Sequence, residues 1–150
     1  MPMSPDEVEA FLAAPRLCHF ATVDEDGLPR VRPLWYLWRE GAFWFTTRLR
    51  IRRTGRDLVA GSPATLSIAS EDEPYRAVVA HGSVEILGKD HQLLRDISTR
   101  YGDSGAWADR VMGQEDRICL RLSPDWLLSW HYGRDDSAAQ DRGVSMRTDV

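Results

Sequence analysis

The chain has 150 residues and a formal net charge of −4, with 43% hydrophobic and 28% charged residues. This length suits one domain with its own core, and these fractions are close to those of soluble globular proteins, which excludes a disordered chain. Because no apolar run is long enough to span a membrane and the N-terminus lacks the profile of a secretory signal, we expect a cytoplasmic protein without a membrane partner.

A short helix is predicted at the start of the chain, to about Ala14. Ser4 is a good N-cap, Pro5 suits the first helical position, and Glu7 stands where a capping box needs it. Pro15 then ends the helix, because proline cannot continue it.

Three antiparallel strands are predicted next. Residues 16–23 form the first, and the turn sequence DEDG joins it to a second over residues 29–38. The Glu40-Gly41 turn then leads to a third strand, AFWFTT.

A loop with a short helix is predicted for residues 48–63, where the alternation of apolar residues stops. Two strands follow it, at residues 64–70 and 71–88. The second is interrupted at Gly82, where a bulge or a barrel bend is expected.

The C-terminal third of the chain contains a predicted helix at residues 90–101, a polar stretch, and a final strand from residue 117. About six short strands with two or three helices predict a mainly β (α+β) fold, a small closed antiparallel β-barrel with short flanking helices. We expect one domain over residues 1–133 and a loosely held tail at residues 134–150.

The cysteines and histidines show no spacing that is typical of a metal site. Cys18 and Cys119 lie in apolar runs, so we interpret both as reduced core residues. The sequence has no HExxH motif, no Ser/His/Asp signature, no P-loop and no glycine-rich dinucleotide fingerprint. We therefore predict no metal, and any phosphate site must be built from side chains.

Five arginines fall in the nine residues 48–56, directly after Thr46 and Thr47. Guanidinium groups with threonine hydroxyls suit a phosphate. Two other interpretations remain open, because eighteen of the nineteen basic residues are arginine: a solvated basic face, or a nucleic-acid contact. Nucleic acid is the weaker one, since the whole chain is acidic and has no recognised reading motif.

Aromatic residues accompany arginine in PRVRPLWYLW, where Trp35 and Tyr36 point to opposite faces of the predicted strand. They could wall a flat ring, or they could simply fill the core. Pro33 indicates a strand edge or a bulge, where its missing N–H does no harm. Trp130, in the final strand, could belong to a site, or it could simply help to close the barrel.

The order of these features resembles the pyridoxamine-phosphate-oxidase-like, FMN-binding split-barrel family and its deazaflavin-using branch. The resemblance covers about residues 6–132 and is carried by LCHFATVDEDGLPRVRPLWYLWREGAFWFTT, the Arg-rich stretch, DLVAGSPATLSIAS and EDEPYRAVVAHGSVEIL. It implies a six-stranded antiparallel split β-barrel that holds FMN or the deazaflavin coenzyme F-420 at the interface of a homodimer.

The resemblance also implies roles for individual residues. Arg32, Pro33, Leu34 and Trp35 would lie along the cofactor ring, Thr46 and Thr47 near its ribityl chain, Arg52, Arg53 and Arg56 at the phosphate, and Trp130 would reach the site, commonly from the partner subunit. One departure is that Arg52-Arg53 follows the Thr-ended strand at a greater distance than the family's basic pair does.

The resemblance implies an oxidoreductase in which the cofactor carries out hydride or electron transfer with a small organic substrate. No catalytic side chain is predicted, since the carboxylates are scattered over turns and helices. True pyridoxamine-phosphate oxidase is disfavoured, because the chain is shorter and lacks that enzyme's C-terminal Arg/His motif. The alternative is a non-catalytic flavin- or haem-binding barrel, with His19, His81 or His131 as the haem ligand.

Overall fold

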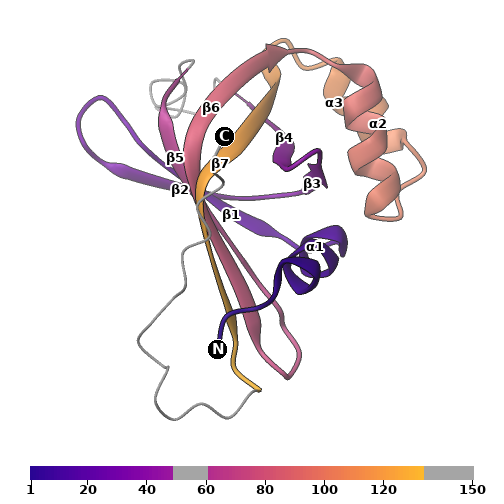
Figure 1. The fold of residues 1–150 in the computed structure, drawn as a ribbon. Helices are drawn as coiled ribbons and strands as arrows, with labels where there is room; N and C mark the ends of the chain where they lie inside the picture. Colours follow the sequence, from indigo (N-terminus) through magenta and orange to yellow (C-terminus); the bar gives the residue numbers. More distant parts are fainter. Residues whose placement is uncertain (49–60, 134–150) are drawn as a thin grey trace.

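A computed structural model describes residues 1–48 and 61–133 of the chain, which form one antiparallel sheet and three helices (Figure 1). The elements in chain order are α1 (Pro5–Ala13), β1 (Cys18–Val23), β2 (Pro29–Leu34), β3 (Tyr36–Arg39), β4 (Ala42–Arg48), β5 (Pro63–Ala69), β6 (Arg76–Gly88), α2 (His91–Arg100), α3 (Ala106–Met112) and β7 (Arg117–His131). The predicted mainly β class with short flanking helices is confirmed.

The described residues contain seven strands where the sequence predicted six. The difference arises at Trp35, which divides the predicted strand 29–38 into β2 and β3. These two strands do not pair with each other: β2 pairs with β1, and β3 pairs with β4. The prediction of three antiparallel strands in succession is therefore wrong, and two separate hairpins take their place.

The strand order explains how the sheet becomes a barrel. It is β2-β1-β5-β6-β7-β4-β3, so that β2 and β3 stand at its two ends. Because only Trp35 joins these end strands, the sheet has to curl until its two edges approach each other (Figure 1). We call this meeting point of the edges, at Trp35, the seam.

The interior of the barrel is filled by apolar side chains. The rings of Phe20 and Phe45 lie 4.7 Å apart, and Phe11 and Leu12 of α1 pack into the same cluster. Tyr36 is fully buried there, and its hydroxyl donates to the carbonyl of Leu12 at 3.1 Å. Burial raises the pKa of Tyr36 to about 12. Full burial of such side chains is the main favourable term for the fold.

Several local predictions are confirmed. Ser4 and Glu7 form the capping box of α1. Pro33 lies on β2, an edge of the sheet order, where no partner needs its N–H. The β6–β7 register shifts between His81 and Gly82, and a Cβ on Gly82 would lie 2.4 Å from the carbonyl oxygen of Ser123. Gly82 therefore permits the close approach of two strands at the bulge.

Helix α3 was not predicted, because it has only seven residues and lies in a polar stretch that contains glycine. It is held by Asp103, whose carboxylate accepts bonds from the backbone N–H groups of Gly105 and Trp107. The hydrogen bond from Ser98 is the largest cause of the lowered pKa of Asp103. These bonds depend on the end of α2 being in place.

Two sequence predictions lie largely or wholly outside the described residues: the loop with a short helix at 48–63, of which 49–60 are not described, and the tail at 134–150. In the part of the chain that the structure covers, no helix is long and apolar enough to cross a membrane.

Candidate functional site

The two faces of β4 have different surroundings. Phe45 and Thr47 point into the barrel, and Thr47 is buried opposite Ile118 of β7. Thr46 points to the outer face, where it stands opposite Cys119. Because side chains alternate along a strand, only one of the two predicted threonines can reach any one site.

Helices α2 and α3 cover this outer face and form a second apolar cluster over it, which we call the seam compartment. Its members include Trp35, Tyr101 and Trp107 together with Leu93, Leu94, Ile97 and Cys119. Trp35 stacks on Tyr101 with ring centroids 4.7 Å apart and nearly parallel planes, and Trp107 is tilted against it at 5.1 Å. The two helices thus fix the Trp35 side chain.

Tyr101 also fixes the backbone at the seam. Its hydroxyl accepts a bond from the backbone N–H of Tyr36 at 3.1 Å and donates to the carbonyl of Arg16 at 2.5 Å. Burial raises the pKa of Tyr101, so the hydroxyl keeps its proton at neutral pH. The side chain at the C-cap of α2 therefore ties the start of β3 to the segment before β1.

A cavity of about 240 Å³ lies at the seam and is called the seam cavity here. Its lining residues come from β2, β4, α3, β7 and the segments beside them: Leu17, Pro33, Leu34, Trp35, Thr46, Trp107 and Arg117. Four of these residues were predicted from the sequence as cofactor-binding, namely Pro33, Leu34, Trp35 and Thr46. The seven lining residues thus come from five separate segments of the chain that meet at one place.

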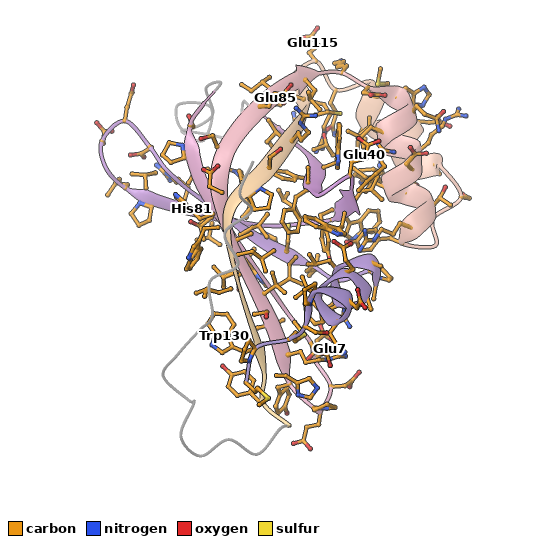
Figure 2. All side chains as sticks on the ribbon, viewed as in Figure 1. Glu7, Glu40, His81, Glu85, Glu115 and Trp130 are labelled. Atoms are coloured by element: carbon orange, nitrogen blue, oxygen red, sulfur yellow. The ribbon has the colours of Figure 1, made fainter. Side chains whose placement is uncertain are left out.

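The other predicted site residues do not line this cavity. Arg32 lies on β2 opposite Phe20, and its guanidinium donates to the hydroxyl of Thr22 at 3.1 Å. Thr47 faces the barrel interior. Trp130 is near the far end of β7, away from α2 and α3 (Figure 2), so one subunit does not bring it to the seam cavity. Arg52, Arg53 and Arg56 lie outside the described residues.

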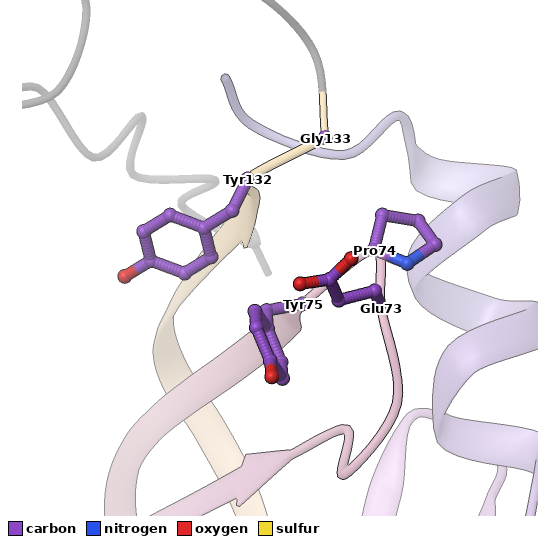
Figure 3. A pocket seen from close by; sticks show the side chains of 5 residues that line it. All are labelled: Glu73, Pro74, Tyr75, Tyr132 and Gly133. Atoms are coloured by element: carbon purple, nitrogen blue, oxygen red, sulfur yellow. The ribbon is translucent and has the colours of Figure 1, made fainter.

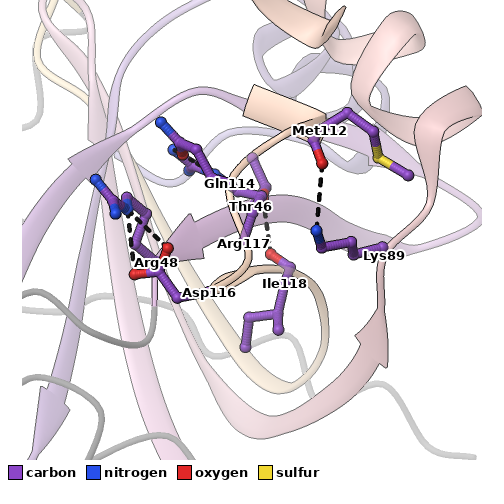
Figure 4. A network of polar contacts seen from close by, with 8 residues as sticks. All are labelled: Thr46, Arg48, Lys89, Met112, Gln114, Asp116, Arg117 and Ile118. Carbon is purple, nitrogen blue, oxygen red and sulfur yellow. Dashed lines mark hydrogen bonds and ion pairs between the residues drawn. The ribbon is translucent and has the colours of Figure 1, made fainter. Parts of the chain in front are cut away.

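The seam cavity has a cationic end formed by paired strands (Figure 4). Arg48 and Arg117 stand opposite each other in the β4–β7 register. Arg48 Nε donates to both carboxylate oxygens of Asp116, at 3.0 and 3.2 Å. Arg117 donates from Nε and from one terminal nitrogen to the side-chain oxygen of Gln114, at 3.0 and 2.6 Å. The carboxylate of Asp116 therefore pairs with Arg48, whereas Arg117 is held by an uncharged amide.

The electrostatics of Arg117 follow from this arrangement. Burial is the largest cause of its lowered pKa, and the positive charge of Arg48 lowers it further, whereas Asp116 acts in the opposite direction. Gln114 fixes the guanidinium without neutralising it. Local positive charge is thus available to an anionic group beside a hydroxyl and two tryptophans.

Sequence reasoning missed three residues of the cavity: Leu17, Trp107 and Arg117. Trp107 belongs to the short helix that was not predicted. Arg117 opens the correctly predicted final strand, but its position beside Thr46 depends on the pairing of β4 with β7. No spacing along the chain carries that information.

The residues present suit a flat, conjugated cofactor with an anionic group. Tryptophan rings can pack on a ring system, and Arg117 can donate hydrogen bonds to oxygen atoms, whereas the Thr46 hydroxyl already donates to the carbonyl of Ile118 at 2.7 Å. A volume of about 240 Å³ lies below the range of about 300–1,000 Å³ that is usual for ligand pockets. Within the described residues there is no group of three or more His, Cys, Asp or Glu that could hold a metal ion.

Comparison with known proteins supports the fold. The family model described as pyridoxamine 5'-phosphate oxidase matches residues 4–131. A comparison with curated proteins finds no match.

Three solved structures show the likeness. A conserved hypothetical protein from Mycobacterium tuberculosis is 22% identical with a TM-score of 0.70, covering 87% of this chain and 86% of that chain. An F420 reductase is 24% identical with a TM-score of 0.64, covering 79% of this chain and 94% of its own. The haem storage protein HutZ from Vibrio cholerae is 19% identical with a TM-score of 0.67, and the match covers 85% of this chain and 94% of that chain. At these identities the likeness shows a shared fold.

Proposed function

The chain belongs to the pyridoxamine 5'-phosphate oxidase family, and from this premise we propose that it is a cytoplasmic oxidoreductase using FMN or coenzyme F-420 on a small conjugated organic substrate. One observation carries the proposal. Pro33, Leu34, Trp35 and Thr46, which sequence reasoning selected as cofactor-binding residues, line a single cavity.

The walls of the seam cavity support a flat ring as the ligand. Trp35 is held between Tyr101 and Trp107, so its ring is oriented before any ligand arrives. A preorganised wall lowers the entropy cost of binding. When bound, the cofactor would supply hydride or electron transfer, and the apolar walls would orient it and exclude water.

Electrostatics support an anionic group on the ligand. Arg117 and Thr46 line the cavity, and Arg48 adds positive charge behind them. We propose that Arg117 donates to oxygen atoms of the cofactor. The phosphate grip by Arg52, Arg53 and Arg56 stays a prediction from the sequence.

We also propose that a homodimer completes the site. The seam cavity is small for a whole cofactor, and Trp130 could contribute only from a partner subunit. Apolar side chains that a partner could cover lie on the β1–β2 hairpin, where Val23 and Val31 are 56% and 63% exposed. Light scattering of the purified protein tests this, and a monomer that binds the cofactor tightly would contradict it.

Titration of the purified protein with FMN and, separately, with F-420 tests the proposed cofactor. We expect saturable binding of one of them, measured as a change of cofactor fluorescence. Trp35→Leu removes a wall of the cavity and should weaken binding. Trp44→Leu is the matched control, because Trp44 belongs to the same compartment but does not line the cavity. Equal affinities of the two variants, or binding of neither cofactor, would refute the proposal.

A second candidate function is haem binding, which a separate cavity favours. His19 lines a cavity of about 480 Å³ together with Arg16, whose charge could pair with a propionate. An absorption spectrum after addition of haem distinguishes the candidates. A Soret shift that His19→Ala abolishes supports haem, and flavin or deazaflavin bands support the oxidoreductase.

A further inference from the structure

A cavity of about 490 Å³ lies where β7 ends (Figure 3), whereas the seam cavity lies where β7 begins. It is lined by Glu73, Pro74, Tyr75, Tyr132 and Gly133, and we call it the tyrosine cavity. Its volume is within the range of small-molecule sites. None of its residues belongs to the seam cavity.

The walls of the tyrosine cavity are fixed by backbone contacts. The N–H of Tyr132 donates to the carbonyl of Tyr75 at 2.9 Å, which holds the two tyrosines on adjacent strand ends. A Cβ on Gly133 would lie 2.5 Å from Cβ of Pro74, so the segments that carry these two residues pack closely against each other. The backbones of the two tyrosines are therefore held next to each other.

The preceding loop is fixed as well. The N–H of Ser70 donates to the carbonyl of Arg76 at 2.8 Å, and the N–H of Arg76 donates to the hydroxyl of Ser70 at 2.8 Å. This pair of bonds closes the loop that carries Glu73. The backbone of Glu73 thus belongs to a closed loop beside the two tyrosines.

Three side chains of this cavity, those of Glu73, Tyr75 and Tyr132, are exposed. Tyr75 and Tyr132 are 50% and 61% exposed, although tyrosine rings are largely apolar. Glu73 makes no hydrogen bond or ion pair with any residue that the structure describes. Figure 3 shows its carboxylate on the same side of Pro74 as both rings.

We propose that the tyrosine cavity binds a small organic cation with a guanidinium head. A carboxylate pairs with guanidinium through two parallel hydrogen bonds, and aromatic faces attract its planar cation. An anionic ligand would be repelled by Glu73, and a neutral one could gain hydrogen bonds from it but no ionic attraction. The proposal does not depend on cofactor binding at the seam.

Isothermal titration of the full chain with agmatine, an alkylguanidine, tests the proposal. We expect saturable binding of about millimolar affinity that weakens as salt is added. Glu73→Gln should weaken it about fivefold. Glu71→Gln is the matched control, since it removes the same charge from the same loop but does not line this cavity, and it should leave the affinity unchanged.

The tyrosines provide an independent readout. Tyr132→Leu should weaken agmatine binding about threefold, whereas Tyr132→Phe, which keeps the ring, should not. Circular dichroism of each variant verifies folding. Absence of saturable binding to the folded wild type, or equal affinities of the Glu73 and Glu71 variants, would overturn the proposal.

Discussion

The barrel interior and the seam compartment lie on opposite faces of β4 and β7, and they are built differently. The interior is sealed: Phe20 and Phe45 are fully buried among other apolar side chains. The seam compartment is only partly closed, since Trp35 and Trp107 are half-buried and a guanidinium borders them. Alternation along one strand therefore separates side chains that stabilise the fold from side chains that can bind a ligand.

The two cysteines illustrate the same difference. Cys18 is in the interior, and burial raises its pKa to about 12. Cys119 is in the seam compartment, where burial also raises the pKa of its thiol, but Asp90 and Thr46 lie close to it. Apolar packing surrounds the first thiol, and polar groups reach the second.

The largest expected effect separates binding from stability. Replacing Arg52 and Arg53 together by alanine should weaken cofactor binding by about 3–6 kcal/mol, since a hydrogen bond to a charged group contributes about 1.5–3 kcal/mol. Cofactor titration measures this, and urea unfolding without cofactor should show no change. Arg95→Ala, on the exposed face of α2, is the control. Unchanged affinity would contradict the phosphate grip and favour the interpretation of residues 48–56 as a solvated basic face.

The interior should show the opposite behaviour. Phe45→Ala should lower the free energy of unfolding by about 3–5 kcal/mol, because it removes a buried ring and leaves a cavity. Urea unfolding of the cofactor-free protein measures this. Trp44→Leu, one residue away on the other face, should cost less because Trp44 is only half-buried. Equal losses in the two variants would contradict the distinction between the faces.

At the cationic end of the seam cavity, Arg117→Met should weaken cofactor binding by about 1.5–3 kcal/mol. The free energy of unfolding should stay constant or rise, because a partly buried guanidinium next to Arg48 is removed. Arg117→Lys should restore part of the affinity, since it keeps the charge but not the planar fork. A lowered free energy of unfolding together with unchanged cofactor affinity would assign Arg117 to the fold instead.

The smallest effect is expected in the β1–β2 hairpin, outside both regions. The pKa of Asp24 is lowered, chiefly by the hydrogen bond from the N–H of Leu28 and also by Arg30 and Asp26. Because its pKa is lowered, Asp24 stabilises the fold at pH values above its ordinary pKa of 3.8. This stabilisation is lost as the pH falls from 3.8 through the lowered pKa. The stability difference between wild type and Asp24→Asn should therefore be present at neutral pH and shrink in acid. A difference that grows on acidification would contradict it.

Local signals were sufficient for much of the fold. The capping box at Ser4 fixed the start of α1, and the bulge at Gly82 was expected from one glycine in a long β run. The break at Trp35 was not predicted, because PRVRPLWYLW has the composition of one continuous strand. What ends β2 there is a change of pairing partner, which local composition does not report.

The sequence by itself determined the mainly β class, most of the strands, and a set of candidate residues that includes Pro33, Leu34, Trp35 and Thr46. These follow from short-range preferences and from the order of motifs. Tertiary structure decided which candidates meet: it placed Thr47 inside the barrel, and it added Trp107 and Arg117 to the cavity. The physical reason is that a site between strands and helices depends on register and on barrel closure, and both arise from contacts between residues far apart in the chain.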